Sequence, residues 1–347
     1  MMAERITLVE LTDDTRPLVV EARAEMGAGL DGESGAELVA NVSRILPFSC
    51  VDGPGNRMVI FLQGCNFNCG SCHNPHTIKN CNHCGDCVAT CPTGALSVAG
   101  GVNENAGKTD MTATTTHKPA QKAAQKPKVL WQPELCTNCD KCLEVCSYQS
   151  SPKISRYTVA QLLELLLPRA AFLSGVTVSG GEASMQLDFV VALFKAIKSH
   201  DSLAHLSCYI DTNGHLAMSG WQQLMPYLDG AMVDVKAWDE SVHKTLTGRS
   251  HRQVFASIAC LAAANKLAEV RLLHIPAHSD FEHWFSDVGQ WLAALPPDII
   301  IRLNGFRRHG VRGSAATWPE CTKAQMAEFR QGLIAHSGRD IAMPFMG

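Results

Sequence analysis

The spacing of the cysteines constrains this chain more than any other feature, because eleven of the fifteen fall into three ordered runs. The first run has the spacing C-x3-C-x2-C and consists of Cys65, Cys69 and Cys72. The other two runs share the spacing C-x2-C-x2-C-x3-C, which bacterial ferredoxins use to ligate [4Fe–4S] clusters. They consist of Cys81, Cys84, Cys87 and Cys91, and of Cys136, Cys139, Cys142 and Cys146. We therefore expect the chain to fold around metal clusters.

Three thiolates on one short loop can hold three irons of a [4Fe–4S] cluster and leave the fourth iron open. A cluster built only for electron transfer normally has four protein ligands. An open iron can instead chelate the amine and carboxylate of an amino acid. This arrangement suits S-adenosylmethionine (SAM), whose C–S bond breaks when the reduced cluster passes an electron to the sulfonium. The first run therefore predicts a SAM-binding cluster, and the other two predict auxiliary clusters, three [4Fe–4S] clusters in all.

The two four-cysteine runs are expected to exchange ligands. In two-cluster ferredoxins the fourth cysteine of each run ligates the other cluster. We therefore expect Cys146 to complete the cluster of the first ferredoxin-type run and Cys91 to complete that of the second.

Two ordinary explanations of cysteine-rich chains fit less well. A disulfide framework belongs to small secreted chains, whereas this chain has 347 residues and no apolar leader at its start. Tetrahedral zinc requires pairs of ligands separated by a dozen or more residues, not groups of three and four cysteines. The remaining cysteines are expected to be small buried hydrophobic residues. They are Cys50, Cys208, Cys260 and Cys321.

The composition excludes several classes of partner. A formal charge of -3 and a pI near 6.5 leave no basic footprint for nucleic acid or an anionic membrane. Aromatic residues make up only 6% of the chain, which argues against a stacking surface for single strands. No apolar stretch approaches the ~18 residues of a membrane span. We expect a cytoplasmic protein of anaerobic cells, because oxygen damages an exposed cluster.

The order of the predicted elements divides the chain into four parts. Residues 1–42 form an extension without an assigned role, and residues 43–75 hold the first strand and the SAM-cluster loop. Residues 76–152 form a ferredoxin-like insert with a flexible loop at 103–128, whose composition lacks an apolar face. Residues 153–347 complete the larger domain.

The larger domain shows alternating strands and helices. Strands are predicted at 58–62, 175–178, 206–210, 231–235, 270–275 and 299–303, and helices at 158–167, 186–200, 220–228, 251–265, 281–295 and 322–336. This alternation predicts an α/β fold with a parallel sheet, either open or curled into a partial barrel.

Polar or metal-binding residues follow each of the six strands. They lie at 65–72, 179–182, 211–214, 234–236, 271–276 and 304–310. In (β/α) barrels the functional groups gather on the loops at the C-terminal ends of the strands. Gly180 and Gly181 would allow close backbone approach to a ligand, and Lys236 and Arg271 could each bind a carboxylate. The ordinary alternatives are a glycine turn and aspartates that cap turns.

The motifs resemble those of the glycyl-radical-enzyme activating enzymes, a branch of the radical SAM superfamily. The resemblance rests on residues 52–57, on 61–65 with Cys69 and Cys72, and on 73–75, and it extends over about residues 42 to 310. Residues 179–182, 211–214, 234–236, 246–248 and 271–276 are similar as well. The double ferredoxin insert resembles the longer activases, most closely the YjjW-type activases.

The resemblance implies a partial (β/α)6 barrel with SAM on the open cluster. The enzyme would be an oxidoreductase whose 5′-deoxyadenosyl radical removes a hydrogen from a backbone glycine of a partner, the cognate glycyl radical enzyme. A flavodoxin- or ferredoxin-type protein would donate electrons. Asp211, Thr212, Asp234 and the carbonyl of Met232 would surround a monovalent cation. The residues expected to face the cofactor are Ser71, His73, Gly180, Gly181, Glu182, Asp211, Asp234, Lys236, Arg271 and Arg307.

The chain departs from the family pattern in three places. The residue before the third cluster cysteine is usually aromatic, but here it is Ser71. Short activases carry a histidine in the last-strand loop, where this chain has Arg307 with His309 nearby. Cys146 is followed by Ser147 rather than by proline.

Two other functions remain open at this point. One is a radical SAM enzyme that modifies a peptide or small molecule with the insert as its auxiliary clusters. The other is a polyferredoxin-type electron carrier, which does not account for a three-cysteine loop at the end of a strand.

Overall fold

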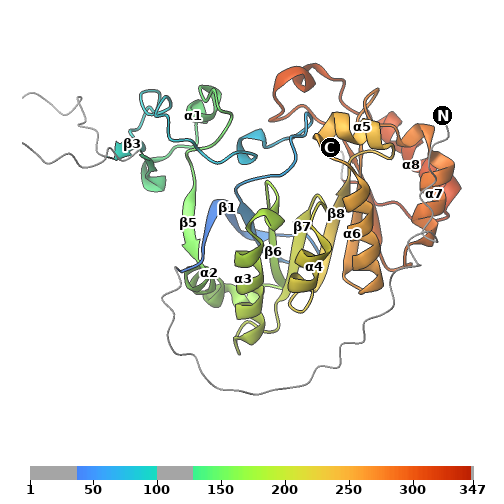
Figure 1. Ribbon diagram of the computed structural model, residues 1–347, viewed down its shortest axis with the longest axis horizontal. Coiled ribbons are helices and arrows are strands. Elements are labelled where there is room, and N and C mark those ends of the chain that lie inside the picture. Colours follow the sequence, from blue (N-terminus) through green and yellow to red (C-terminus); the bar gives the residue numbers. More distant parts are fainter. Residues whose placement is uncertain (1–36, 100–127, 345–347) are drawn as a thin grey trace, which may run out of the picture.

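The computed structural model describes residues 37–99 and 128–344. The predicted flexible loop, apart from Lys128, and most of the predicted N-terminal extension lie outside the described residues. The larger part of the described chain is an α/β domain, and the cysteine-rich insert stands beside it at the upper left of Figure 1.

The α/β domain is built on one eight-stranded sheet with the strand order β10-β9-β8-β7-β6-β2-β1-β5. Its strands are β1 (Val39–Ser49), β2 (Arg57–Leu62), β5 (Ser155–Thr158), β6 (Gly175–Gly180), β7 (Ser207–Thr212), β8 (Gly230–Val235), β9 (Leu267–His274) and β10 (Ile300–Gly305). The six predicted strands are confirmed as β2 and β6 to β10. They form a continuous parallel array, as βα alternation requires. The array does not close, because its outer strands β2 and β10 do not pair with each other. With their helices, these six strands form the predicted partial barrel, called the barrel below.

Strands β1 and β5 extend the sheet beyond β2. Both are antiparallel: β1 pairs with β2, and β5 pairs with β1. Neither was predicted, because Asn41 and Ser43 interrupt the apolar pattern of β1 and β5 has only four residues. Strand β1 begins at Val39 and so crosses the predicted boundary at residue 42.

Helices lie against the parallel strands, and α3, α4 and α6 pass in front of the sheet in Figure 1. The helices of this domain are α2 (Val159–Leu166), α3 (Leu187–Ser199), α4 (Met218–Leu224), α5 (Glu240–Thr247), α6 (Arg252–Ala263), α7 (Phe285–Ala294) and α8 (Lys323–Ser337). Six of them match the predicted helices to within a few residues. Helix α5 was not predicted, although Asp239 caps its start and Gly248, with φ 79°, ends it.

Short 3-10 helices connect several of these elements. They span Pro75–Thr77, Pro133–Leu135, Leu167–Phe172, Ala183–Gln186, Phe281–His283 and Gly313–Thr317.

A fully buried arginine ties together the N-terminal ends of three strands. Arg57 at the start of β2 donates hydrogen bonds to Thr177 Oγ1 (2.7 Å) and Val176 O (2.8 Å) of β6, and to Ser207 Oγ (2.9 Å) of β7. Its guanidinium lies 4.3 Å from the centre of the Tyr209 ring. Segment 52–57, part of the family resemblance, therefore ends in a structural anchor at the edge of the sheet opposite the predicted site.

The insert has little hydrophobic interior of its own. Its hairpin of β3 (Leu96–Ala99) and β4 (Lys128–Trp131) and its one-turn helix α1 (Lys141–Glu144) enclose a small core. The buried members of that core are Cys87, Leu96, Val129, Cys142 and Leu143. The insert joins the larger domain where Ser150 Oγ donates to Lys79 O (2.7 Å), and Gln63 Nε2 donates to the same carbonyl oxygen (2.7 Å).

The isolated cysteines differ from the prediction in two cases. Cys208 and Cys321 are buried as expected, but Cys50 is exposed in the loop after β1 and Cys260 is partly exposed on α6. Among the described helices, none is long and apolar enough to cross a membrane.

Candidate functional site

The first cysteine run forms a loop directly after β2, at the C-terminal edge of the parallel strands. The loop returns along its own start, because Gly64 N donates to Thr77 O (2.8 Å) and Cys65 N donates to Ile78 O (2.9 Å). Gly64 makes the turn out of the strand with φ 104°, a conformation that favours glycine. The loop thus presents Cys65, Cys69 and Cys72 from a backbone fixed at both ends.

The end of helix α5 holds the middle of this loop. Thr247 O accepts from Asn68 N (2.9 Å), Leu246 O accepts from Gly70 N (3.1 Å), and Arg249 Nε donates to Asn66 O (3.1 Å). The sequence linked residues 246–248 to the site only through the family resemblance. The structure supplies the physical reason, since the last carbonyls of a helix have no partner within the helix itself.

Aromatic contacts support the same loop from below. Phe67 is 2% exposed, and its ring lies edge-on to His215 and His243 with centroid distances of 5.6 and 5.7 Å. His243 is fully buried, and burial lowers its pKa to about 4, which keeps the ring neutral near pH 7. Sequence reasoning did not identify His243, because a lone histidine in a helix carries no motif.

The thiols of the loop are partly buried, and burial disfavours their charged forms. Burial raises the pKa of Cys65 to about 12 and that of Cys69 to about 11. Lys236 opposes this shift at Cys69 and at Cys72. The three thiols and Lys236 therefore form a site in which bound iron would supply the positive charge that the thiolates need, and these residues fit the three protein ligands of a SAM-binding cluster.

Gly180 and Gly181 are required by close packing against β2 and the cluster loop. A Cβ atom on Gly180 would lie 2.1 Å from Leu62 O, and one on Gly181 would lie 2.4 Å from Gly64 O. Gly180 also has φ 127°. The close approach predicted for these glycines is therefore present between backbone segments, and contact with SAM stays a prediction.

Glu182 is 1% exposed, and protein donors engage its carboxylate. It accepts from Thr212 Oγ1 (2.7 Å), Asn213 N (2.7 Å) and Ser184 Oγ (2.6 Å). Burial raises its pKa, and these donors counteract the shift. Asn213 Nδ2 in turn donates to Asn66 Oδ1 (2.7 Å), so Glu182 positions the loop after β7 against the cluster loop.

A charged network crosses the strands beneath the cluster loop. Arg271 on β9 pairs with Asp211 on β7 (Nη1–Oδ1, 2.7 Å) and with Glu269 (Nε–Oε1, 2.5 Å). Lys236 pairs with Asp234 (Nζ–Oδ2, 2.8 Å). Arg302 on β10 also pairs with Glu269 (Nε–Oε1, 2.8 Å). The structure thus brings together four predicted residues and adds Glu269, a member of the β9 alternation two residues before Arg271.

The two aspartates of this network have different acidities. Burial raises the pKa of Asp211, although Arg271 and Ser179 oppose the shift. Burial also acts on Asp234, but Lys236 and Arg271 outweigh it and lower the pKa of that carboxyl group. In the predicted cation set, Thr212 Oγ1 is engaged by Glu182, and Met232 lies opposite Asp211 in the sheet register.

The loop after β10 covers the far end of the cluster loop. Its Arg307 O pairs with His73 Nε2 (2.9 Å), and a Cβ atom on Gly310 would lie 2.1 Å from His73 O. The Arg307 guanidinium instead donates to Cys321 O (3.0 Å). Ser71 is 7% exposed between these segments. His73 and Ser71 therefore lie at the predicted site, while contact between the Arg307 side chain and a cofactor stays a prediction.

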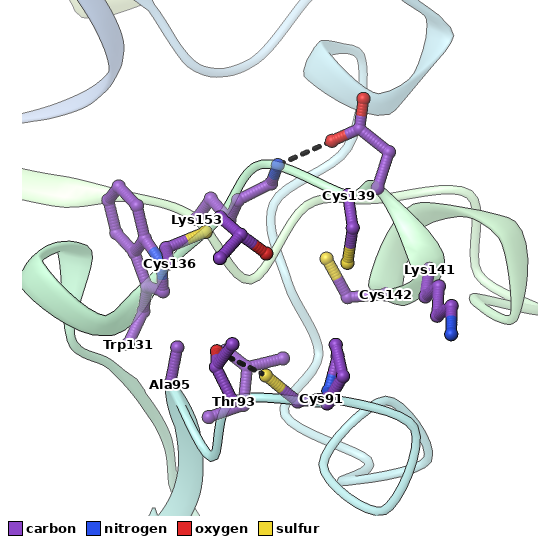
Figure 2. Close-up of a pocket in the computed structure, with 13 residues that line it drawn as sticks. Cys91, Thr93, Ala95, Trp131, Cys136, Cys139, Lys141, Cys142 and Lys153 are labelled. Carbon is purple, nitrogen blue, oxygen red and sulfur yellow. Dashed lines mark hydrogen bonds and ion pairs between the residues drawn. The ribbon is translucent and has the colours of Figure 1, made fainter.

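A second constellation lies in the insert, where four cysteines line an open hollow (Figure 2). Cys91 comes from the first ferredoxin-type run, whereas Cys136, Cys139 and Cys142 come from the second. This grouping is the one expected from an exchange of the fourth ligand. Within the described ranges, no three His, Cys, Asp or Glu side chains are close enough to bind a single metal ion. A cubane spreads its ligands farther apart than one ion does, so a hollow ringed by four cysteines fits it.

The other auxiliary group is assembled around Cys81. Burial raises the pKa of Cys81, and the neighbouring Cys146 and Cys84 raise it further, which places Cys146 beside the first ferredoxin-type run. Cys87 is likewise affected by Cys81 and Cys84. The structure thus supports a grouping of Cys146 with the first three cysteines of that run.

Comparison with known proteins agrees with both constellations. Residues 80–150 match the family model of the 4Fe-4S dicluster domain. A putative glycyl-radical enzyme activating enzyme of Haemophilus influenzae is 26% identical over 301 residues, which cover 81% of this chain and 87% of the relative. The isethionate sulfite-lyase activating enzyme of Desulfovibrio desulfuricans is 25% identical, over 74% of this chain and 79% of its own. Among solved structures, QueE of Escherichia coli aligns with 89% of this chain and 95% of its own, at 13% identity and a TM-score of 0.44.

Proposed function

We propose that this chain, a homologue of the radical SAM activating enzymes of glycyl radical enzymes, removes a hydrogen atom from a backbone glycine of a partner glycyl radical enzyme. The observation that carries the proposal is the three-cysteine loop at the C-terminal edge of the parallel strands, next to Lys236. The ferredoxin-type insert alone would fit an electron carrier. A carrier has no use for a loop of three cysteines above a network of buried charges.

The proposed mechanism assigns separate tasks to the residues of the barrel. When bound, the open cluster and SAM would supply a one-electron cleavage that yields the 5′-deoxyadenosyl radical. Cys65, Cys69 and Cys72 would hold the cluster. Lys236, whose pKa is raised because Asp234 and Cys69 outweigh the effect of burial, would stay charged and attract the carboxylate of SAM.

The charged network would hold these groups in place. Glu269 and Asp211 keep the Arg271 guanidinium inside the barrel, where it could share the carboxylate with Lys236. Glu182 would act as a positioning residue, because it fixes Asn213 and through it the start of the cluster loop. These assignments give each buried charge a partner, as burial requires.

A monovalent cation near Asp211 and Asp234 belongs to the same proposal. In the structure Arg271 and Lys236 neutralise these two carboxylates. If the side chain of Arg271 or Lys236 turns toward the carboxylate of SAM, its aspartate loses that partner. A bound monovalent cation would then balance the negative charge of the aspartate. Thr212 Oγ1 and the carbonyl of Met232 would provide further oxygen ligands. SAM binding should then weaken when potassium and sodium are replaced by a bulky organic cation.

The auxiliary clusters would pass electrons inward from a flavodoxin- or ferredoxin-type donor. The insert's two cysteine groups fit two clusters, and the family model matched by residues 80–150 is that of a dicluster domain. We also place the protein in the cytoplasm of anaerobic cells, because free thiols and an exposed cluster both require reducing conditions.

The test is to mix the reduced, reconstituted protein with SAM and its cognate glycyl radical enzyme and to record the EPR spectrum. We expect a doublet that collapses when the partner's glycine is deuterated at Cα. The matched control is Cys69→Ala, which should give no signal. SAM cleavage without a radical on the partner, together with a modified peptide or small molecule, would refute the proposal in favour of a different radical SAM substrate.

A further inference from the structure

A partly buried lysine, Lys153, faces the hollow that Cys91, Cys136, Cys139 and Cys142 surround. Lys153 lines this hollow, and Figure 2 shows its side chain reaching over the cysteines toward Asp140. The side chain is 13% exposed, and its Nζ lies 2.5 Å from Asp140 Oδ1. Lys153 is not a ligand in any cysteine motif, and the proposed function gives it no task.

The charge on Lys153 acts on the cysteines themselves. Burial raises the pKa of Cys142, and Asp140 and Cys136 raise it further, whereas Lys153 lowers it. In return, Asp140, Cys142 and Cys136 outweigh burial and raise the pKa of Lys153, so the ammonium group stays protonated. Lys141 also borders the hollow, but it is exposed, and Figure 2 shows its side chain pointing away from the sulfur atoms. Water screens such an exposed charge much more effectively.

A lysine is also present near the other auxiliary group, where Lys79, two residues before Cys81, places its Nζ 4.9 Å from the centre of the Tyr148 ring. Lys153 differs in that its side chain lines the hollow between the cysteines. A cluster gains one negative charge on reduction, and a nearby positive charge stabilises that form.

The Lys153–Asp140 pair also lies near the segment that leads back to the barrel. Both residues also act on the pKa of His76. Burial lowers this pKa, and Arg312 and Lys153 lower it further, whereas Asp140 raises it. His76 belongs to the 3-10 helix Pro75–Thr77, directly before Ile78, whose carbonyl accepts from Cys65 N.

We propose that Lys153 raises the reduction potential of the cluster held by Cys91, Cys136, Cys139 and Cys142. When this cluster is reduced, the external donor loses one electron, and the cluster gains that electron. The inference rests on the proposed cluster content of the insert and is independent of the glycine substrate.

The experiment is a potentiometric titration of the reconstituted full chain followed by EPR. The Lys153→Gln variant should lower the ratio of reduced to oxidised cluster at a fixed potential by roughly tenfold. The matched control Lys141→Gln removes the same charge from an exposed position and should stay within about twofold of the parent chain. The EPR signal of this cluster is assigned with the Cys139→Ser variant, in which that signal should be absent. The signals of the other two clusters should not move.

A second variant protects the test against misfolding. Asp140→Asn removes the negative partner and should shift the same cluster in the opposite direction, while Lys153→Arg should keep the parent potential. Equal shifts in both auxiliary clusters, or no shift in Lys153→Gln and Asp140→Asn, would overturn the inference. An iron content of about four per chain would refute the proposed auxiliary clusters and this inference with them, whereas a missing glycyl radical would leave it standing.

Discussion

The SAM-cluster loop and the auxiliary hollow are the two groups of cysteines proposed to hold clusters, yet the protein supports them in different ways. The loop of residues 65–72 is held by hydrogen bonds from α5 and from the loop after β7. The returning segment 77–78 also bonds to it. The hollow lies in an insert whose small core is partly made of cysteines. We therefore expect the barrel to shape its cluster site before metal arrives, whereas the insert would need bound clusters to complete its interior.

The difference follows from how much apolar surface each region can bury. Strands β2 and β6 to β10 have side chains such as Ile60, Val178 and Leu272 that are fully buried between sheet and helices. In the insert, Leu96, Val129 and Leu143 are the buried aliphatic side chains of the core. A core of this size does not offset the entropy of ordering the surrounding loops. Metal–thiolate bonds have to supply the remainder.

The largest effect is expected when the cluster ligand Cys69 is changed. Cys69→Ala should abolish reductive cleavage of SAM, because the open cluster loses one of its three protein ligands. The barrel should remain folded, since the hydrogen bonds that hold its loop do not involve the side chain of Cys69. Production of 5′-deoxyadenosine measures the cleavage of SAM, and circular dichroism measures the folding of the barrel. Cys142→Ala should instead leave SAM binding measurable, and 5′-deoxyadenosine from Cys69→Ala at the parent rate would contradict the assignment of the loop.

Removal of iron should separate the two regions. After chelation under anaerobic, reducing conditions, we expect proteolysis within the insert at residues 80–99 and 128–150, while residues 155–344 resist cleavage. The reason is that metal binding contributes folding free energy where a core is small. Mass spectrometry of the fragments measures the outcome. If the barrel is cleaved as fast as the insert, the proposed contrast between the two regions is wrong.

Arg57→Met should destabilise the barrel and leave the insert's clusters intact. The change leaves buried acceptors on β6 and β7 without donors, and we expect a loss of about 3–5 kcal/mol in the free energy of unfolding. Chemical denaturation followed by tryptophan fluorescence reports the barrel, and visible absorbance reports the clusters. Arg44→Met, at a position in β1 outside the Arg57 contacts, is the control. Bleaching of the clusters in parallel with barrel unfolding would argue against independent support.

A smaller effect is expected from pH, through His243 beneath the cluster loop. Its folded pKa of about 4 lies below the ordinary value of 6.5, so the unfolded chain binds more protons between these values. The contribution of His243 is therefore complete above pH 6.5 and is lost as the pH falls toward 4, by up to roughly 3 kcal/mol. Unfolding of the barrel at pH 7 and pH 5 should show this loss, and His243→Gln should reduce it. An unchanged slope in that variant would exclude His243 as the titrating group.

The cysteine spacing and the βα alternation could be read from the sequence because both are local patterns. Six strands were predicted from apolar runs bounded by turn residues, and all six are present in the sheet. The grouping of Cys91 with the later run was also expected, since ligand exchange is a property of the spacing itself. The spacing predicts this grouping because cysteines a few residues apart lie on the same loop, wherever that loop lies in the fold.

Tertiary structure decided which groups meet across strands. Nothing near Glu269 in the sequence indicates that it would join Arg271 to Arg302, and Arg57 was read as part of a signature rather than as a buried anchor. Nor did the sequence indicate that the Arg307 guanidinium donates to the carbonyl of Cys321, and its contact with the cofactor stays a prediction. These contacts join residues up to 150 positions apart. Their geometry depends on the register of neighbouring strands and on the burial of charge, and neither is encoded in the pattern of any single segment.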